Sequence, residues 1–341
     1  MPGLPERPTD ALDPSAPLAS PLRDAHGRTV TYLRLSLTER CNFRCGYCTP
    51  PDSRFDGESL GAEELVRLVG IFARLGVRRV RLTGGEPLLR RDVLEIARGI
   101  RALPGIAELA MTTNGHLLER MAGALLEAGV TKLNISLDSL DPDRFKRLTG
   151  GAGSLDRLLA GIAACLNARF DDVKLNTVIV RGENDGEAAD IIRYAWSKGI
   201  VARFIECMPF SHGRPVPTLE LIERIRRDGI DLRPESEVSA SRPSGPSEYW
   251  TGDGGRVGFI RPLTRCFCGS CNRVRVASNG DLRACLGGTQ TVPLAPLLRG
   301  ENAEAEVARA VRWALQRKPE HHSMTVPDAG RKLLSMRSIG G

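Results

Sequence analysis

The sequence predicts an α/β fold in which parallel strands alternate with amphipathic helices. Between about residues 24 and 210, a short apolar segment followed by a helix-like segment occurs six times. Glycines follow several of the helix-like segments, and chemically useful side chains follow the apolar ones. Alternation of this kind gives parallel strands joined by helical crossovers. Six such units form either an open sheet or an incomplete barrel.

The first segment of each unit has the length and apolar content of a buried strand. The predicted strands cover residues 31–37, 79–83, 108–112, 132–137, 173–180 and 202–206. A helix is predicted over residues 63–75, because Leu65 and Phe72 recur at the spacing of one buried face. The segments 121–128 and 155–166 show the same periodicity. Glycine often ends a helix, and three of the predicted helices are followed by Gly76, Gly129 and Gly199.

Residues that can bind ligands lie at the ends of the predicted strands or just after them, and one lies within the fifth strand. They include Cys41, Gly84, Gly85, Glu86, Asn114, Ser136, Asp138, Asn176 and Met208. In a parallel sheet or barrel the carboxyl ends of the strands meet on one face, and ligands bind there. The sequence therefore predicts a single ligand-binding face.

Composition divides the chain into four parts. Residues 1–23 are rich in Pro, Ala and Asp and lack the apolar core of a secretory signal, so we expect a flexible tail. Residues 24–210 contain the six units. Residues 211–255 are rich in Pro, Ser and Gly and predict a linker, with one helix-like stretch at 219–227. Residues 256–341 form a C-terminal region.

The overall composition favours a globular protein that acts on a small anionic molecule. The chain is 41% hydrophobic and 26% charged, as in soluble domains, and no apolar run has the length of a membrane span. The net charge of +7 comes from scattered arginines. Without a basic run or interleaved aromatic residues, we expect no nucleic-acid binding. A small phosphorylated substrate fits this charge better.

Six of the nine cysteines form two groups near opposite ends of the chain, a spacing that indicates metal ligation in a reducing, cytoplasmic setting. Cys41, Cys45 and Cys48 have the spacing Cys-x3-Cys-x2-Cys. Three thiolates on a [4Fe–4S] cluster leave one iron open to a substrate or cofactor. Zinc is the alternative, although structural zinc sites use four protein ligands and no local fourth one is present.

The second group, Cys268, Cys271 and Cys285, also offers three ligands. A second iron–sulfur cluster with an open iron is the sharper hypothesis. Zinc remains the alternative if a distant residue such as His321 or His322 completes the site.

The other three cysteines have weaker assignments. The two-residue offset between Cys266 and Cys268 is poor for joint chelation. Cys165 shares a helical face with apolar residues, which favours core packing. Cys207 follows a predicted strand, where it could line the site.

The first cysteine group, with Tyr47 before its last member and Gly84-Gly85-Glu86-Pro87 one unit later, resembles the signature of the radical S-adenosylmethionine (SAM) superfamily. The resemblance implies that a reduced cluster passes an electron to SAM. Methionine leaves, and a 5′-deoxyadenosyl radical removes hydrogen from the substrate. It also implies SAM contacts by Tyr47, Gly85, Glu86, Ser136 and Met208.

Within that superfamily the chain resembles the GTP 3′,8-cyclases of molybdenum cofactor biosynthesis. The resemblance runs from about Asp24 to the last residue. The segments that carry it are 34–41, 81–88, 134–138, 203–208, 268–275 and the terminal Gly340-Gly341. It implies an incomplete (β/α)6 TIM-like barrel closed by the C-terminal region, two [4Fe–4S] clusters, and a lyase. The product would be (8S)-3′,8-cyclo-7,8-dihydroguanosine 5′-triphosphate.

The same resemblance implies the substrate site and the partners. GTP would lie between the clusters, with its guanine on the open iron of the second one. The implied GTP contacts are Arg34, Arg81, Thr112, Lys174, Arg273 and Arg275. The implied catalytic residues are Arg273, Arg275, Gly340 and Gly341. The implied partners are an external one-electron reductant and cyclic pyranopterin monophosphate synthase, which would be the next enzyme. The protein itself would be a monomer or homodimer.

The residues themselves support part of this assignment. Arginine forks match phosphate oxygens, and a triphosphate needs several cations. Arg273 and Arg275 alternate, so they share one face of a strand. Lys174, one of six lysines, lies on a predicted strand.

Two other functions fit the cysteine pattern. One is a two-cluster radical SAM maturase that modifies peptides, although such an enzyme has no need of the Arg273/Arg275 pair. The other is a non-catalytic iron–sulfur sensor or electron carrier, which has no use for the Gly-Gly-Glu-Pro segment.

Overall fold

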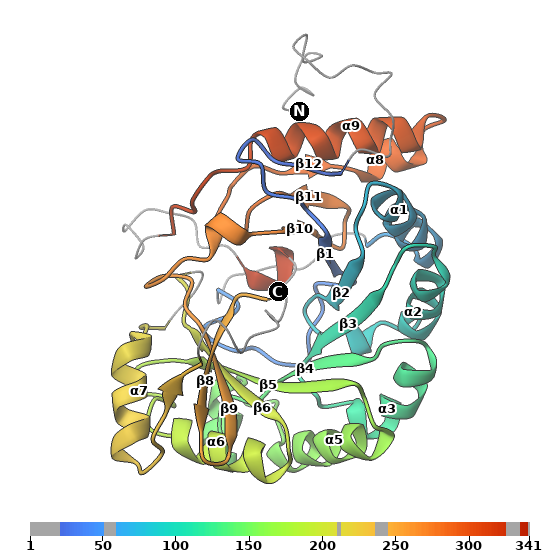
Figure 1. Ribbon diagram of the computed structural model, residues 1–341. Coiled ribbons are helices and arrows are strands. Elements are labelled where there is room, and N and C mark those ends of the chain that lie inside the picture. The colour runs from blue at the N-terminus through green and yellow to red at the C-terminus, as the bar shows by residue number, and fades with distance from the viewer. Residues whose placement is uncertain (1–20, 51–58, 210–212, 236–244, 325–334, 340–341) are drawn as a thin grey trace.

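Parallel strands from both halves of the chain form one curved sheet at the centre of the protein (Figure 1). The computed structural model describes residues 21–50, 59–209, 213–235, 245–324 and 335–339. In this part of the chain the sheet has 12 strands, in the order β12-β11-β10-β1-β2-β3-β4-β5-β6-β9-β8-β7. The two ends of this order do not pair, so the predicted incomplete barrel is confirmed and the open barrel curves around a central space.

The six predicted units follow one another along the chain. Their elements are β1 (Tyr32–Ser36), α1 (Ala62–Arg74), β2 (Arg79–Thr83), η1 (Pro87–Leu89), α2 (Val93–Ala102), β3 (Glu108–Thr113), α3 (Leu118–Glu127), β4 (Lys132–Ser136), α4 (Pro142–Leu148), α5 (Leu155–Ala168), β5 (Asp172–Ile179), α6 (Ala188–Ser197), β6 (Val201–Glu206) and α7 (Thr218–Arg227). The glycines expected to end helices do so, since Gly76, Gly129 and Gly199 all have positive φ. Helix α3 begins three residues before its predicted start.

The remaining elements come from the C-terminal part. They are β7 (Arg233–Pro234), β8 (Ser247–Gly252), β9 (Gly255–Ile260), η2 (Cys268–Ser270), β10 (Arg273–Val276), β11 (Asp281–Arg283), β12 (Val292–Pro293), α8 (Ala295–Arg299), α9 (Ala303–Gln316) and η3 (Met336–Ile339). Strand β9 pairs in parallel with β6, and β10 pairs in parallel with β1. The C-terminal region thus extends both edges of the barrel sheet.

Two expected boundaries differ from the structure. The predicted linker contains α7, as expected, but also β8, which pairs along its whole length with β9. The predicted tail includes Leu22, which is fully buried, and Arg23, which bridges to Thr29. Burial of the Leu22 side chain against the barrel and backbone pairing of Arg23 stabilise this segment more than exposure to solvent would. Residues 1–20 lie outside the described part.

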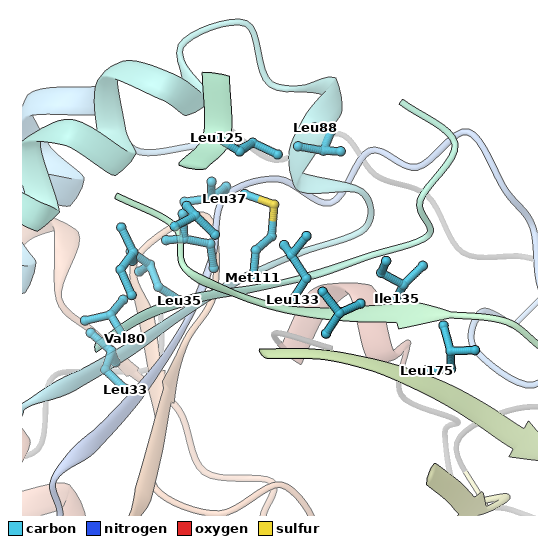
Figure 2. Packing of buried hydrophobic residues seen from close by; sticks show 14 of the residues in the cluster. Leu33, Leu35, Leu37, Val80, Leu88, Met111, Leu125, Leu133, Ile135 and Leu175 are labelled. Carbon is cyan, nitrogen blue, oxygen red and sulfur yellow. The ribbon is translucent and has the colours of Figure 1, made fainter. Parts of the chain in front are cut away.

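Apolar and polar residues alternate along the barrel strands. Leu33, Val80, Met111, Leu133 and Leu175 lie in one buried apolar layer (Figure 2). Helices α1, α2, α3, α5 and α6 lie outside the curved sheet and cover this layer (Figure 1). Truncation of such a Leu to Ala typically costs about 2 to 5 kcal/mol. Since successive side chains point to opposite faces, the polar residues between them face the inside of the barrel.

Helices α8 and α9 pack beside α1 at the edge of the barrel. Arg299 pairs with Glu64 of α1 at 2.6 Å, and Arg74 of α1 pairs with Glu304 of α9. These contacts join the end of the chain to its first helical unit. A search of the described helices finds none with the length and apolar character that crossing a bilayer requires.

Candidate active site

The parallel register gathers the predicted GTP-binding residues on the inner face of the barrel. Arg34 of β1 is the pairing partner of Arg275 on β10 and of Arg81 on β2. Burial lowers the pKa of Arg34 well below its usual value, and the charge of Arg275 lowers it further. Burial and the charge of Arg273 lower the pKa of Arg275 to about 10. A row of mutually repelling, partly buried cations is suited to bind a multiply charged anion.

Lys174 lies in the next inner row, beside Asn134 of β4. Its ammonium forms an ion pair with Asp172. Burial nevertheless lowers the pKa of Lys174 to about 7, and Arg203 and Arg81 contribute in the same direction. The positive charge of Lys174 is therefore close enough to the arginines of the inner face to be repelled by them.

Two of the predicted contacts have unused hydrogen-bonding atoms. The hydroxyl of Thr112 and the Nε of Arg273 are buried without a hydrogen-bond partner in the described part of the chain. Buried polar atoms are seldom left unpaired unless a ligand or water meets them. The guanidinium of Arg273 also stacks on Phe267, 4.9 Å from the ring centroid. Both side chains are suited to contact a polar ligand.

Two inner-face residues had been missed as site candidates. The hydroxyl of Tyr32 accepts a hydrogen bond of 2.5 Å from Arg81 Nε. Arg203 Nε donates to Asn176 Oδ1 at 2.9 Å, and burial lowers the pKa of Arg203 to about 10. Arg203 lies between two apolar residues of β6, and Tyr32 is followed by an apolar residue of β1. This local alternation is the sequence signal that could have identified them.

The Gly84-Gly85 segment after β2 touches the backbone that precedes the first cysteine. Gly85 N donates to Thr38 O at 2.7 Å, and Glu86 N donates to Arg40 O at 2.8 Å. A Cβ on Gly85 would lie 2.3 Å from Arg40 O. Glycine is therefore required for this close backbone approach.

The carboxylate of Glu86 is directed into the fold. It is fully buried and accepts hydrogen bonds from Leu88 N at 3.0 Å, Thr113 Oγ1 at 2.7 Å and Asn114 N at 2.7 Å. Burial outweighs these bonds and raises the pKa of Glu86 to about 7. The side chain of Glu86 thus connects the ends of β2 and β3. Because its carboxylate is already used within the fold, the SAM contact predicted for this segment would be made by backbone oxygens.

The three thiols of the first group, Cys41, Cys45 and Cys48, are partly buried on one loop. Burial raises the pKa of all three, to about 11 for Cys41, and their mutual repulsion contributes for Cys45. Asn114 Nδ2 lies 3.9 Å from Cys41 Sγ, which brings the end of β3 to this loop. A bound cationic iron core would offset the cost of buried thiolates, so the donor set fits a cluster.

Tyr47 is anchored to the barrel. Its hydroxyl donates to Asp138 Oδ2 at 2.5 Å, and Asp138 Oδ1 accepts from Val178 N at 2.9 Å. Burial raises the pKa of Asp138 to about 6. Ser136 is the last residue of β4, and Met208 is the second residue after the end of β6. Both predicted SAM contacts therefore lie at the carboxyl ends of strands.

The last described residues meet the first cysteine loop. Met336 N donates to Cys48 O at 3.0 Å, and the guanidinium of Arg337 donates to Phe43 O. Element η3 lies within the curve of the barrel (Figure 1). The predicted catalytic residues Gly340 and Gly341 follow η3 directly, but they lie outside the described residues.

The second cysteine loop precedes β10, with Cys268 and Cys271 at η2. Burial would raise the pKa of Cys271, but Lys318 and Arg273 outweigh it and lower that pKa. The charges of Cys271 and Cys285 act on Arg275, which places both thiols near the arginine row. The donor set of three thiols beside cations suits a cluster with an open iron.

Completion of this site by His322 does not fit its contacts. His322 Nε2 lies 2.7 Å from Pro262 O, and its Nδ1 accepts from Met324 N at 3.2 Å. Both ring nitrogens are therefore engaged. Among the described residues, no three His, Cys, Asp or Glu side chains gather as ligands of one ion. A cubane has a different requirement, because each thiolate binds its own iron atom.

The remaining cysteines are placed as follows. Cys165 is fully buried in the main apolar core, as predicted. Cys207 is also buried, and burial raises its pKa to about 11. Cys266 is exposed.

Glu86→Ala should lower the free energy of unfolding by on the order of 3 kcal/mol, because three buried donors lose their acceptor. Glu86→Gln keeps the shape and should lose less. Urea unfolding of the apoprotein measures both, with the exposed Glu95→Ala on α2 as control. Equal stability of the Glu86 and Glu95 alanine variants would contradict this role.

Family models and curated relatives match most of this chain. Residues 35–195 match the Radical SAM superfamily, and residues 200–324 match Molybdenum Cofactor Synthesis C. A GTP 3′,8-cyclase of Pseudomonas syringae pv. syringae is 41% identical over 330 residues, which are 94% of this chain and 98% of that protein. One of Marinobacter nauticus is 42% identical over 331 residues, with the same coverage of both chains.

Solved structures support the fold. Streptococcus suis SuiB bound to S-adenosylmethionine has a TM-score of 0.61 and 14% identity, over 83% of this chain and 67% of that chain. The resemblance to the radical SAM superfamily is confirmed. The identity to curated relatives extends over almost the whole chain, and this chain therefore belongs to the GTP 3′,8-cyclase family.

Proposed function

We propose that this protein is a lyase that converts GTP into (8S)-3′,8-cyclo-7,8-dihydroguanosine 5′-triphosphate, the first step of molybdenum cofactor biosynthesis. The observation that carries the proposal is the row formed by Arg81, which is buried, and by Arg34 and Arg275, which are partly buried, with Lys174 in the neighbouring row. A triphosphate would bring several negative charges to these closely spaced cations. The names of the relatives with about 40% identity point to the same substrate.

The first loop would hold one [4Fe–4S] cluster through Cys41, Cys45 and Cys48. Cys268 and Cys271 of the second loop, with Cys285 after β11, would hold another. With SAM bound, the reduced first cluster would supply one electron, and cleavage of SAM would release methionine and a 5′-deoxyadenosyl radical. The remaining requirement is geometric. The chain has to hold the ribose and guanine still, exclude water, and prevent side reactions of a radical.

Particular residues meet that requirement. Arg34, Arg81 and Lys174 would hold the phosphates. Arg275 is the member of the arginine row that lies on β10, and Arg273 on the same strand follows Cys271 after one residue. The free hydroxyl of Thr112 and Nε of Arg273 would hydrogen-bond the nucleotide. On the SAM side, Gly85 and the neighbouring backbone oxygens would receive the methionine amino group. Tyr47, Ser136 and Met208 would border the cofactor.

The proposal includes partners. An external one-electron reductant has to reach the clusters, and cyclic pyranopterin monophosphate synthase would take the product. We propose a cytoplasmic monomer or homodimer. The peptide-modifying alternative is not favoured, because curated relatives that align over 94% of this chain are GTP 3′,8-cyclases.

Anaerobically reconstituted protein with SAM, dithionite and GTP should yield 5′-deoxyadenosine and a cyclised GTP product, identified by mass spectrometry. Arg273→Ala and Arg275→Ala should lower product formation by at least about 100-fold, since each removes a charged contact. Arg101→Ala on α2, far from the inner face, is the control. SAM cleavage that does not depend on GTP, with GTP intact, would refute the substrate.

Removal of Gly340 and Gly341 should leave iron content unchanged but abolish cyclisation. The resemblance to the cyclases implies a catalytic role for these two glycines, and glycine allows close backbone approach. Element η3, which precedes them, contacts the first cysteine loop. Iron analysis and product assay measure the two effects separately. A truncated protein with full activity would exclude this role.

GTP affinity should fall as the pH rises above about 7. The pKa of Lys174 is depressed to about 7, so its ammonium is charged below that pH and neutral above it. Triphosphate binding favours the charged form of Lys174. Above about pH 7 the neutral amine must therefore take up a proton when GTP binds, and this weakens binding by at most about tenfold per pH unit.

Calorimetric titration of GTP between about pH 6 and about pH 9 tests this linkage. Lys174→Arg keeps its charge throughout and should lack the added slope. Lys174→Met should bind weakly at low pH and approach the wild type at high pH. Identical slopes for the wild type and the arginine variant would reject Lys174 as the titrating group.

A further inference from the structure

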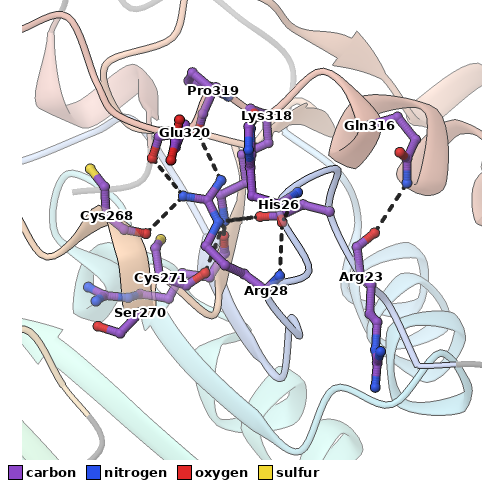
Figure 3. A network of polar contacts seen from close by, with 12 residues as sticks. Arg23, His26, Arg28, Cys268, Ser270, Cys271, Gln316, Lys318, Pro319 and Glu320 are labelled. Carbon is purple, nitrogen blue, oxygen red and sulfur yellow. Dashed lines mark hydrogen bonds and ion pairs between the residues drawn. The ribbon is translucent and has the colours of Figure 1, made fainter.

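A buried ionic trio lies behind the second cysteine loop. Asp24, Arg28 and Lys318 have side chains that are 0%, 7% and 2% exposed. Arg28 Nε donates to Asp24 Oδ2 at 2.6 Å, and Lys318 Nζ lies 4.0 Å from the same oxygen. Figure 3 shows Arg28 and Lys318 converging on Cys268 and Cys271. The trio joins the start of the fold, the residues after α9 and the cysteine loop.

Its donors are directed at the backbone of the cysteine loop. Arg28 Nη1 donates to Cys268 O at 2.8 Å. Lys318 Nζ donates to Arg273 O at 2.9 Å and to Cys271 O at 3.4 Å. The carbonyls of both cysteines in the pair are therefore fixed by buried cations, and so is the carbonyl of the first arginine on β10.

The trio carries one more positive charge than negative charge. Asp24 is already paired with Arg28 and also accepts from the backbone N–H groups of His26 and Arg28, both at 3.0 Å. Burying a further ammonium is costly unless another negative group compensates it. A [4Fe–4S] core with three thiolates carries a net negative charge and gains another on one-electron reduction. The surplus charge of Lys318 is placed to compensate it.

We propose that Lys318 is a positioning residue for the second cluster. It fixes the position of the cysteine loop relative to Arg273, and its positive charge stabilises the reduced form of the cluster. This inference rests on the proposed function, because it requires a cluster on Cys268, Cys271 and Cys285. Nearby charge and hydrogen bonding are among the factors that set the potential of such clusters. The role of Lys318 is thus distinct from the contacts with GTP.

Lys318→Met is the informative variant. Methionine fills similar volume, and the Asp24–Arg28 pair that remains is neutral, so the variant leaves no unpaired buried charge. Lys318→Arg keeps the charge. Arg317→Met is the matched control, because Arg317 is the preceding residue, is exposed and stacks on Trp313, 4.0 Å from the ring centroid. Each variant is made in the full chain and in a Cys41→Ser/Cys45→Ser/Cys48→Ser background, where only the second cluster is expected.

The measurements are iron content, anaerobic redox titration followed by electron paramagnetic resonance, chelator-driven iron loss and thermal unfolding of the apoprotein. In Lys318→Met the second cluster should have a lower midpoint potential. Its iron should also be lost about 10-fold to 100-fold faster, the usual effect of removing an outer-shell partner. Lys318→Arg should restore most of the potential, and Arg317→Met should match the wild type.

The outcomes separate the inference from the function it depends on. Lower thermal stability with an unchanged cluster potential would mean that the trio only links chain segments, and the inference would be wrong. A wild-type potential and iron-loss rate in Lys318→Met would also overturn it, with the proposed function intact. If the cysteine-substituted background binds zinc or no metal, the second cluster is absent, and both the inference and the two-cluster proposal fail.

Discussion

Parallel backbone pairing is the constraint on which the rest of the site depends. Each inner strand alternates one polar side chain with one apolar side chain, and pairing without a register slip places the polar ones in common rows. Arg275, Arg34 and Arg81 form such a row across three strands. A slip of one residue in β1 would turn Arg34 toward the helices and an apolar leucine toward the interior. The apolar layer under the helices therefore determines where the cations lie.

This arrangement departs from a closed barrel filled with apolar side chains. Here the sheet stays open, and its two edges are extended by β9 and β10 from the C-terminal region. The second cysteine loop enters directly before β10, and η3 contacts the first loop. Segments far apart in the chain thus converge on one interior. The polar lining is costly without a ligand, which is consistent with a site built for a highly charged one.

Both cysteine loops are held in place through contacts with backbone atoms in or next to the loops. The first loop is held by close contacts with Gly84 and Gly85, and the second by cations that bind its carbonyls. Fixed carbonyls limit the movement of the thiols that follow or precede them. Glu86 has the same kind of role, because its carboxylate is used entirely by neighbouring N–H and O–H groups. Residues that resemble ligand contacts can therefore serve the framework around the ligand.

Local signals in the sequence determined much of this protein. Helical periodicity, glycine ends and strand length predicted the six units, and cysteine spacing with the Gly-Gly-Glu-Pro segment indicated the chemistry. These features depend on residues close together in the chain, as propensity and chelation do. Only the tertiary structure decided that β9 and β10 join the barrel sheet, that Arg203 and Tyr32 belong to the cationic interior, and that Asp24, Arg28 and Lys318 meet behind Cys271. Those contacts join residues up to almost three hundred positions apart, and their energies exist only after the strands have paired and excluded water.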